Sequence, residues 1–422
     1  MRHTVASRWR LSLTVAASAF AAGGCASAGG SPPVTGAGAP PRAPTEAAGI
    51  VTSLDTTWYV SARARKDGRT LRALSDSLEY GYVVTRFHDR ANQDAAGRYL
   101  EQVDAARVDS ARLAASDFLA RIGAADSSAA ARGEGSVVYI HGFAVSFGRA
   151  IAQGAEIAHR GSYRGPMIVF AWPAHRSLAT WPSPEAVVSR AYREDSASAA
   201  ASNDAFRDAL ALIRDAVRPE ALTVVGHSLG AQLAAEALTK PSALHEALQA
   251  DPLKAVVLYA PDVPVERFRD TLAAALEDIA ARRIVYASAG DWLLGISEIV
   301  NHARRAGRTR SARSLVAEDV EVIDATRGLR ADGAIRKLVE PKHSMRWSSS
   351  ALYDFFSVVR GVPSACRALD GVATLQPDGT WQLTPSPIPV GIPPAVESCV
   401  SHIEALAAGS RSGPRVPEPT RP

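Results

Sequence analysis

The sequence lacks the spacings that mark a metal site, such as C-x-x-C or H-E-x-x-H, and so gives no sign of a metalloenzyme. It also lacks a strong charge excess. The formal net charge of +4 falls to about +1 when Arg2, Arg8 and Arg10 of the expected leader are set aside. This balance excludes the basic surface that is typical of nucleic-acid-binding proteins. The apolar stretch at residues 11–22 is too short to span a bilayer.

The N-terminus has the order of a targeting signal. Three arginines precede the apolar residues 11–22, and Gly-Gly-Cys25 follows. This end resembles a bacterial lipobox, in which the cysteine is lipidated and becomes the new N-terminus, although Ala22 stands where Leu is commonest. An ordinary secretory signal cleaved nearby is the alternative. We expect residues 1–25 to be a lipoprotein-type signal peptide and residues 26–47, rich in Gly, Ala, Pro and Ser, to be a flexible linker.

Cysteine is scarce, with three in the chain. If Cys25 carries lipid, Cys366 and Cys399 remain as an even pair in an exported protein, where a disulfide is the natural use. Two free buried thiols are the alternative.

Ala26 is not Asp, so a signal for retention in the inner membrane is missing. The expected location is therefore the bacterial envelope, anchored to the outer membrane or facing the periplasm.

The most informative stretch is 222–238. A short β-branched run is followed there by a G-x-S-x-G pentapeptide and then by an Ala- and Leu-rich pattern typical of a helix. A serine held on such a tight strand-to-helix turn is a nucleophile elbow. Gly226 and Gly230 provide the bare backbone that the turn requires around Ser228. An ordinary strand–helix turn is the alternative interpretation.

The rest of the chain alternates buried strand patterns with helical ones, which indicates an α/β fold. The expected architecture is a mostly parallel sheet with helices on both faces, spanning residues 48–360. Strand patterns occur at 58–62, 80–84, 137–140, 167–172, 222–225, 255–260, 284–287 and 320–323. The spacing further predicts a helix over 98–122, a loop over 123–134, a long loop over 174–194 and a helix over 196–217.

The pattern changes after residue 361. A hairpin signal lies at 372–383, and the prolines of 385–394 favour extended chain. We interpret residues 361–406 as a small C-terminal appendage stapled by the two cysteines, and residues 407–422 as a disordered tail.

Catalytic partners of Ser228 should lie at the carboxyl ends of other strands, in the chain order serine, acid, histidine. His343 occupies a loop after the last core strand and is the expected general base. Three other histidines follow the serine but lie in helical patterns or in the appendage: His245, His302 and His402.

Two aspartates end strands in the expected region. Asp291 follows the penultimate core strand and is the favoured acid, while Asp262 is the alternative, with helix capping as its ordinary role. Asp324 also ends a strand and is a third, weaker candidate.

Acyl chemistry also requires hydrogen-bond donors for a developing oxyanion. We expect the backbone N–H of Leu229, after the nucleophile, to be one donor and that of Phe143 to be the other. Gly142 permits close backbone approach, and His141 is expected to orient the turn rather than act as a base.

On these residues the chain from about 55 to 360 resembles the bacterial α/β-hydrolase family of unknown function in the esterase/lipase superfamily. The marks are H-G-F at 141–143, F-A-W-P at 170–173, Tyr192 with Asp195, the elbow, A-P-D at 260–262, G-D at 290–291 and His343. Ala144 and Ala174 depart from it, because Asn and Ser are common there. The resemblance implies a serine hydrolase.

We therefore expect an enzyme without a cofactor that acts on small-molecule or lipid esters through Ser228, His343 and Asp291, and that reaches the membrane through its lipid anchor. A thioesterase or peptidase would use the same constellation. A noncatalytic envelope-binding lipoprotein on a hydrolase fold, or an acyltransferase, are the alternatives. Nothing in the sequence indicates the oligomeric state.

Overall fold

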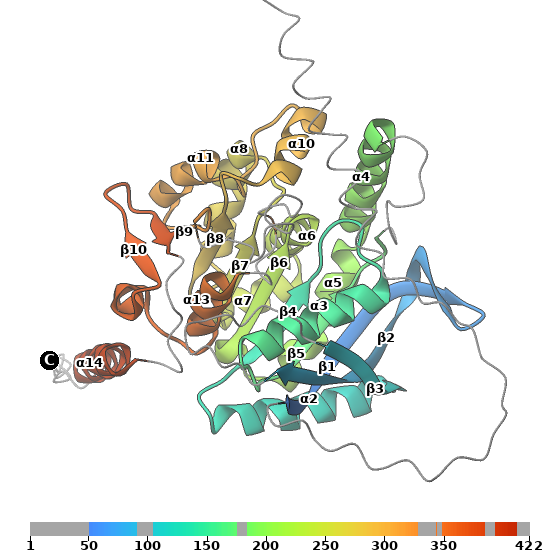
Figure 1. Ribbon diagram of the computed structural model, residues 1–422, viewed down its shortest axis with the longest axis horizontal. Helices are drawn as coiled ribbons and strands as arrows, with labels where there is room; N and C mark the ends of the chain where they lie inside the picture. Colours follow the sequence, from blue (N-terminus) through green and yellow to red (C-terminus); the bar gives the residue numbers. More distant parts are fainter. Residues whose placement is uncertain are drawn as a thin grey trace, which may run out of the picture.

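The computed structural model describes residues 50–90, 104–174, 184–327, 343, 348–384 and 393–411. The expected signal peptide, its Cys25 and the linker at 26–47 lie outside these residues. Within them the chain forms an eleven-stranded sheet in the order β10-β11-β9-β8-β7-β6-β4-β5-β1-β2-β3. The strands from β11 to β1 run parallel, and antiparallel pairs close both edges (Figure 1).

The strands begin and end as follows: β1 Ile50–Lys66, β2 Arg69–Arg90, β3 Asp104–Leu113, β4 Ser136–Ile140, β5 Met167–Ala171, β6 Leu222–His227, β7 Ala255–Tyr259, β8 Arg283–Ala287, β9 Glu321–Asp324, β10 Ala373–Leu375 and β11 Trp381–Leu383. The five-residue strands at the centre are buried along their whole length. Burial on both faces explains why these strands are unbroken apolar runs rather than alternating patterns.

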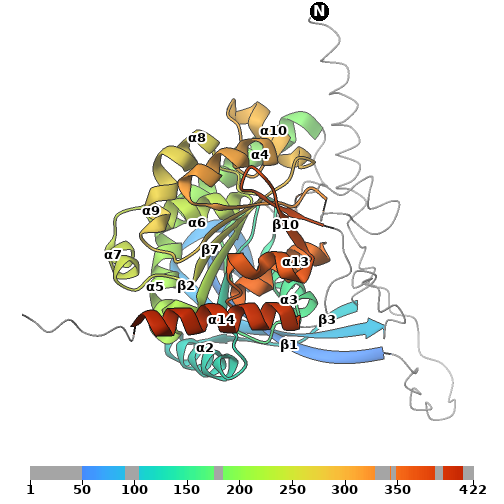
Figure 2. The same cartoon turned by 90° about the vertical axis from the view of Figure 1, so that its left-hand side faces the viewer.

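The α-helices of the described residues are α2 Ala115–Ala130, α3 Phe147–Arg160, α4 Pro184–Ala201, α5 Asn203–Ala216, α6 Leu229–Thr239, α7 Ala243–Ala250, α8 Val265–Arg267, α9 Ala273–Glu277, α10 Trp292–Asn301, α11 Thr309–Ala312, α13 Ser349–Val359 and α14 Pro394–Arg411. One hydrophobic core joins α2, α5, α6 and α9 to one face of the sheet. A second core packs α3 and α13 on the other face (Figure 2).

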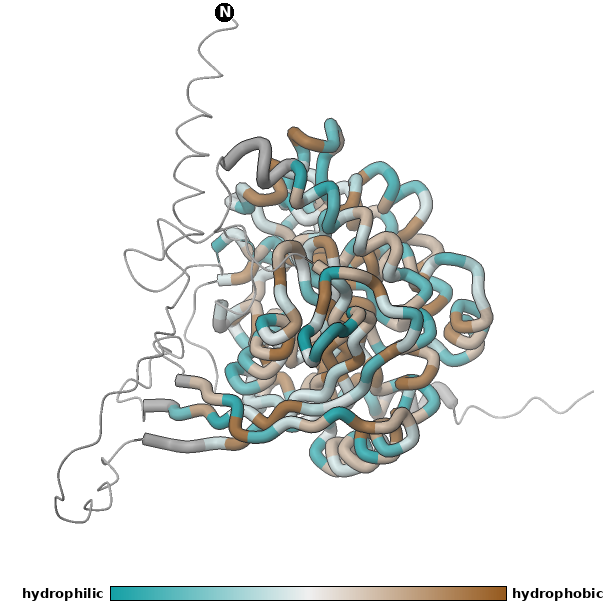
Figure 3. Tube along the Cα trace, turned by 90° about the vertical axis from the view of Figure 1, so that its right-hand side faces the viewer, coloured by the Kyte–Doolittle hydropathy of each residue, from teal (hydrophilic) through white to brown (hydrophobic). Residues whose placement is uncertain are grey.

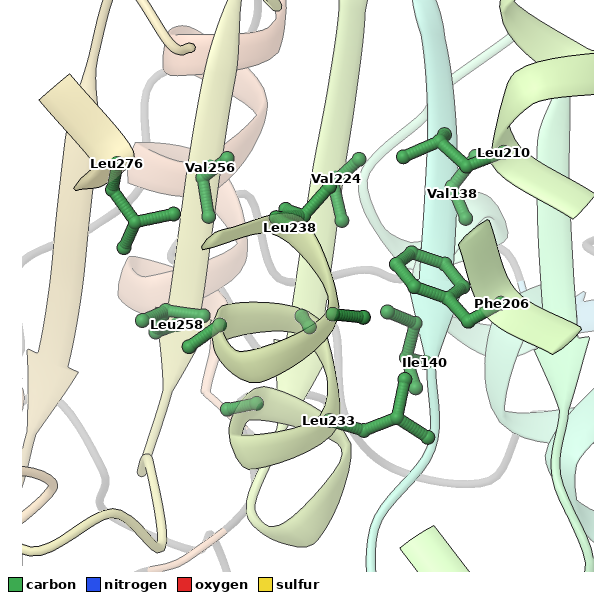
Figure 4. Packing of buried hydrophobic residues seen from close by; sticks show 14 of the residues in the cluster. Val138, Ile140, Phe206, Leu210, Val224, Leu233, Leu238, Val256, Leu258 and Leu276 are labelled. Atoms are coloured by element: carbon green, nitrogen blue, oxygen red, sulfur yellow. The ribbon is translucent and has the colours of Figure 1, made fainter. Parts of the chain in front are cut away.

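Helix α6 fixes the position of the elbow because it is packed over the middle of the sheet. Figure 4 shows its Leu233 and Leu238 against side chains of β4, β6 and β7, with Phe206 of α5 beside them. Each such fully buried side chain contributes on the order of 2 kcal/mol to folding. The strand before the serine and the helix after it are therefore held rigidly.

The expected mostly parallel sheet, covered on both faces, is confirmed, but the N-terminal part differs from prediction. The helix predicted over 98–122 is present only from Ala115, where α2 begins, because residues 104–113 form β3 at the sheet edge. The loop predicted over 123–134 is confined to residues 131–134, since α2 continues to Ala130. Ala- and Arg-rich sequence favours a helix locally, and pairing with β2 overrides that preference at β3. Residues 98–103 lie outside the described chain.

The segment before the elbow differs as well. Part of the loop predicted over 174–194 is helix α4, which begins with Pro184 as its first residue. The single helix predicted over 196–217 is divided at Ser202 into α4 and α5. Proline at the first helical position is a start signal that the sequence did contain. Residues 175–183 lie outside the described chain.

The C-terminal extension is joined to the main sheet rather than simply appended. Its predicted hairpin is present as β10 and β11, and β11 pairs in parallel with β9. Cys366 and Cys399 form the predicted disulfide, with Cα atoms 5.9 Å apart, and pack with Val362 and Val396 in a small core of their own. Helix α14 continues to Arg411, past the predicted boundary at 406. The expected extended run at 385–394 lies mostly outside the described residues.

Figure 3 shows that β1, β2 and β3 project beyond the body of the molecule and carry both hydrophilic and hydrophobic residues. Among the residues described, no helix combines the length and apolar character needed to cross a membrane.

Candidate active site

Ser228 stands at the turn between β6 and α6 in a backbone conformation that L-residues rarely adopt, with φ of 58° and ψ of −119°. Its N–H donates to the carbonyl of Tyr259 at 2.9 Å, and its own carbonyl accepts from Asp262 N–H at 3.3 Å. Such strain persists only where the surroundings enforce it, and it is common at functional sites. The turn is therefore a nucleophile elbow in geometry as well as in sequence.

The two glycines of the pentapeptide are required by close backbone packing. A Cβ on Gly226 would lie 2.5 Å from the Cα of Ala231. A Cβ on Gly230 would lie 2.4 Å from the carbonyl oxygens of Ile140 and His141. The obstacles are backbone atoms that cannot move aside, so any larger residue would displace the serine.

His343 and Asp291 are brought together. Nδ1 of His343 lies 2.5 Å from Oδ2 of Asp291, and both side chains are buried. Asp291 directly follows the exposed turn at 289–290 after β8, and its Oδ1 caps α10 by accepting from Leu294 N–H at 3.0 Å. Because the carboxylate can only accept, Nδ1 of His343 carries the proton, and Nε2 is left as the basic nitrogen.

The electrostatic environment favours the positively charged imidazolium form of His343. Burial by itself lowers the pKa of this imidazole, but the charge of Asp291, the hydrogen bond to it and the charge of Asp262 together outweigh burial. The pKa of His343 is therefore raised above its ordinary value of 6.5. A histidine with a raised pKa accepts a proton more readily, which suits a general base.

His227, inside the pentapeptide, holds His343 from the other side. Its Nε2 lies 2.7 Å from the backbone carbonyl of His343 and donates to it, and the two rings are 4.8 Å apart. The backbone of His343 therefore lies against the residue that precedes Ser228 in the elbow. Sequence reasoning missed this role, because nothing in the pentapeptide signals what its second residue contacts.

Asp262 belongs to a different buried network. It accepts hydrogen bonds from Tyr192 at 2.9 Å and from Ser297 at 2.5 Å, and Nε of Arg305 lies 3.2 Å from its Oδ1. Burial raises the pKa of this carboxyl, and the positive charge of Arg305 opposes that rise. Asp262 thus ties α4 and α10 to the sheet, and His343 makes its carboxylate hydrogen bond to Asp291 instead.

The remaining candidates lie elsewhere. Asp324 accepts from Thr309 and from Thr326 in its own turn. His245 donates to the carbonyl of Leu238, while the other two histidines are exposed on or after helices: His302 and His402. None of these is hydrogen-bonded to the elbow within the described chain.

The turn after β4 lies against the elbow. A Cβ on Gly142 would be 3.1 Å from the Cβ of Ser228, so a larger residue would have to push this turn and the elbow apart. Phe143 follows directly and packs edge-on to Tyr192. Ala144 has a φ of 55°, and its N–H donates to Oδ2 of Asp195 at 3.0 Å. The buried Asp195 therefore fixes the turn that carries the Phe143 N–H, a contact that sequence reasoning did not foresee.

His141 has a structural position. Its ring is fully buried and stacks on Trp172, whose Nε1 donates to the His141 carbonyl at 2.7 Å. Burial, and secondarily the nearby Arg63 charge, lower the pKa of His141 to about 3. The imidazole is therefore neutral at physiological pH, which agrees with the expected role in orienting the turn.

The chain resembles solved esterases only distantly. One of two fungal esterases from Rhizomucor miehei is 13% identical over 74% of this chain and 82% of that chain, with a TM-score of 0.29. Esterase B from Lactobacillus rhamnosis is 10% identical, with coverages of 85% and 88% and a TM-score of 0.26. A hyperthermophilic esterase from the archaeon Pyrobaculum calidifontis is 13% identical, with coverages of 58% and 70% and a TM-score of 0.22. These likenesses say nothing about the substrate.

No curated protein matches the chain. Residues 125–337, half of the sequence, match the family described as "Alpha/beta hydrolase of unknown function (DUF900)". The match includes Ser228 and Asp291 and ends six residues before His343. With the parallel sheet, the elbow and this match together, the chain belongs to the DUF900 family of α/β hydrolases.

Proposed function

We propose that the protein hydrolyses carboxylic esters through Ser228, His343 and Asp291. The observation that carries the proposal is the 2.5 Å contact between Asp291 and Nδ1 of His343, next to a serine on a strained elbow. The paired carboxylate fixes the tautomer that leaves Nε2 basic. The raised pKa of His343 supports the same role.

In the proposed reaction, Oγ of Ser228 attacks the ester carbonyl while Nε2 of His343 takes the hydroxyl proton. Asp291 stabilises the imidazolium that forms. The carbonyl oxygen becomes an oxyanion that accepts hydrogen bonds from the N–H groups of Phe143 and Leu229. The imidazolium then protonates the departing alcohol. Water, deprotonated by His343, hydrolyses the acyl-enzyme and releases the acid.

Labelling with a fluorophosphonate probe tests whether the serine is activated. We expect the wild-type chain to be labelled and Ser228→Ala to remain unlabelled. A noncatalytic binding protein on this fold would leave both unlabelled. Release of free acid from p-nitrophenyl esters in buffer then separates a hydrolase from an acyltransferase, which would need an added acceptor. Parallel assays with thioesters and peptide anilides distinguish the related hydrolase classes.

We further propose that Cys25 carries lipid and tethers the enzyme to the envelope, with residues 26–47 as a flexible spacer. The motive is the lipobox-like Gly-Gly-Cys after a short apolar stretch. Labelled palmitate should enter the wild-type chain but not Cys25→Ser. Equal labelling of both chains, or of neither, would contradict lipidation at this cysteine.

A further inference from the structure

A cavity lies among the projecting strands, away from the residues assigned to catalysis. It has a volume of about 560 Å³, within the roughly 300–1,000 Å³ range of small-molecule sites. Its lining includes four arginines and no acidic residue: Arg65, Arg69, Arg107 and Arg112. We call this cavity the arginine groove.

The positive charge of the arginine groove is only partly balanced. Glu79 lies behind it and pairs with Arg65 at 3.1 Å and with Arg112 at 3.8 Å. Arg69 and Arg107 are exposed and form no ion pair with any of the residues that the structure describes. One carboxylate is therefore paired with two of the four guanidinium groups. Cations gathered in a concave site repel one another, and a bound anion removes that repulsion.

The wall of the groove adds to this field. Phe147, the first residue of α3, lines the groove, so the first turn of that fourteen-residue helix borders it. The positive end of a helix dipole and its free N–H groups favour a negative ligand. The next residue, Gly148, is exposed, and a Cβ placed on it would meet nothing within 4 Å. The space in front of this turn is therefore open.

The same wall is apolar in part. The rings of Tyr59 and Phe147 lie edge-to-face with centroids 5.1 Å apart, and Val83 is also part of the lining. Burial, and next the charge of Glu79, raise the pKa of Tyr59 to about 12, so its phenol stays neutral and adds no negative charge. A ligand that fits both surfaces has an anionic head and an apolar body.

One end of the groove lies at the edge of the sheet where Ser228 sits. β1 and β5 are parallel, and Ser61 pairs with Ala171, the last residue of β5. Arg65 lies four residues further along, beyond the carboxyl end of β5. Between them Arg63 is buried and donates to the carbonyl of Val145 at 2.7 Å. Val145 belongs to the loop that joins Phe143 to α3. Helix α3 itself lies against β1 (Figure 1).

We propose that the arginine groove binds a small organic phosphate, with the phosphate held by the guanidinium groups that line the groove and the apolar part packed on Tyr59 and Phe147. The charge of the ligand favours a phosphate over a carboxylate. A phosphate monoester carries about −1.5 to −2 at neutral pH, whereas a carboxylate carries −1. Two unpaired arginines match the dianion better. Guanidinium groups also bind phosphate through two parallel hydrogen bonds.

Calorimetric titration of the full chain with hexyl phosphate tests the proposal. This probe has no carboxylic ester, so the result is independent of the hydrolase activity proposed above. We expect saturable binding that weakens with salt, weaker binding of inorganic phosphate, which lacks the apolar part, and weaker binding of hexanoate, which has a single charge. Hexanoate binding as tightly as hexyl phosphate, or no binding of hexyl phosphate, would overturn the proposal.

Matched substitutions locate the site. Arg69→Gln and Arg107→Gln should each weaken hexyl phosphate binding roughly 10- to 100-fold, the range for a lost charged hydrogen bond. Arg310→Gln, an equally exposed arginine on α11, removes the same charge and should leave binding unchanged. All three positions are exposed, so unchanged thermal unfolding checks that the variants are folded. An equal loss in Arg310→Gln would mean nonspecific attraction and refute the groove.

Vesicles containing phosphatidic acid distinguish the source of the phosphate. Vesicle binding that is lost in Arg69→Gln and Arg107→Gln would identify a lipid headgroup as the occupant of the groove. Hexyl phosphate binding without vesicle binding would identify a free soluble ligand. Vesicle binding that neither substitution weakens, without hexyl phosphate binding, would contradict the assignment.

Discussion

The carboxylate of Asp195 accepts a hydrogen bond at 3.0 Å from the backbone N–H of Ala144, a residue held at a φ of 55°. The bond runs from helix α4 to the turn after β4, and it stabilises a strained conformation next to the proposed oxyanion donor at Phe143. In the proposed reaction Asp195 is therefore a positioning residue, which acts through the backbone.

Replacing Asp195 should therefore affect the transition state more than substrate binding. We expect Asp195→Ala to lower kcat by roughly 10- to 100-fold with little change in KM, less than the ~10²–10³-fold lost when an oxyanion donor is removed outright. Asp195→Asn keeps an acceptor oxygen and should recover most of kcat. If Asp195→Ala raises KM alone, or if both variants lose only stability, the residue has no such role.

The two aspartates after β7 and β8 should behave differently. Asp291→Asn should lower kcat by roughly 10⁴-fold, because the imidazole loses the partner that fixes its tautomer. Asp262→Asn should change kcat less than about tenfold but destabilise the fold, because Arg305 is left as an unpaired buried charge. Steady-state kinetics and urea unfolding of both variants check this. The reverse order of kcat losses would mean that the acid is misassigned.

The pH profile should report the pKa of His343. Only the neutral imidazole accepts the serine proton, so kcat/KM should rise with pH through that pKa, which lies above the ordinary 6.5. Asp262 also raises the pKa of His343, so Asp262→Asn removes a charge that favours the imidazolium. The acidic limb should therefore move to lower pH in this variant. A limb that moves to higher pH would contradict the electrostatic account.

Two glycines make a matched pair for the elbow. Gly230→Ala places a Cβ 2.4 Å from two backbone carbonyl oxygens and should cost about 1–3 kcal/mol or more of stability together with activity. Gly148→Ala places its Cβ in open space in the first turn of α3 and should be neutral or stabilising by up to about 1 kcal/mol. Urea unfolding gives both free energies. If Gly230→Ala loses no more unfolding free energy than Gly148→Ala, the elbow tolerates a methyl group.

The disulfide closes a loop of 33 residues and should stabilise the C-terminal extension. We expect the double variant Cys366→Ser and Cys399→Ser to lose on the order of 3 kcal/mol of unfolding free energy while kcat is retained. The urea midpoint of the oxidised wild type against this variant measures the loss. Identical midpoints would mean that packing alone holds α14 in place.

Features that depend on short stretches of chain are predictable from the sequence. The elbow follows from Gly226, Ser228 and Gly230, whose conformation is set by neighbours within a few residues. The central strands were evident because burial on both faces requires continuous apolar runs. Chain order also placed His343 after the last core strand, and an even pair of cysteines indicated their bond.

Features that depend on contacts between distant residues follow only from the tertiary structure. β3 is a strand because β2 offers an unpaired edge, although its own residues favour a helix. Asp262 and Asp291 end adjacent strands and look alike in sequence. Tyr192, Ser297 and Arg305 surround the first, so the second contacts His343. Hydrogen bonds between residues 35 to 70 positions apart leave no periodic pattern in the sequence, which is why only the folded chain distinguishes the two carboxylates.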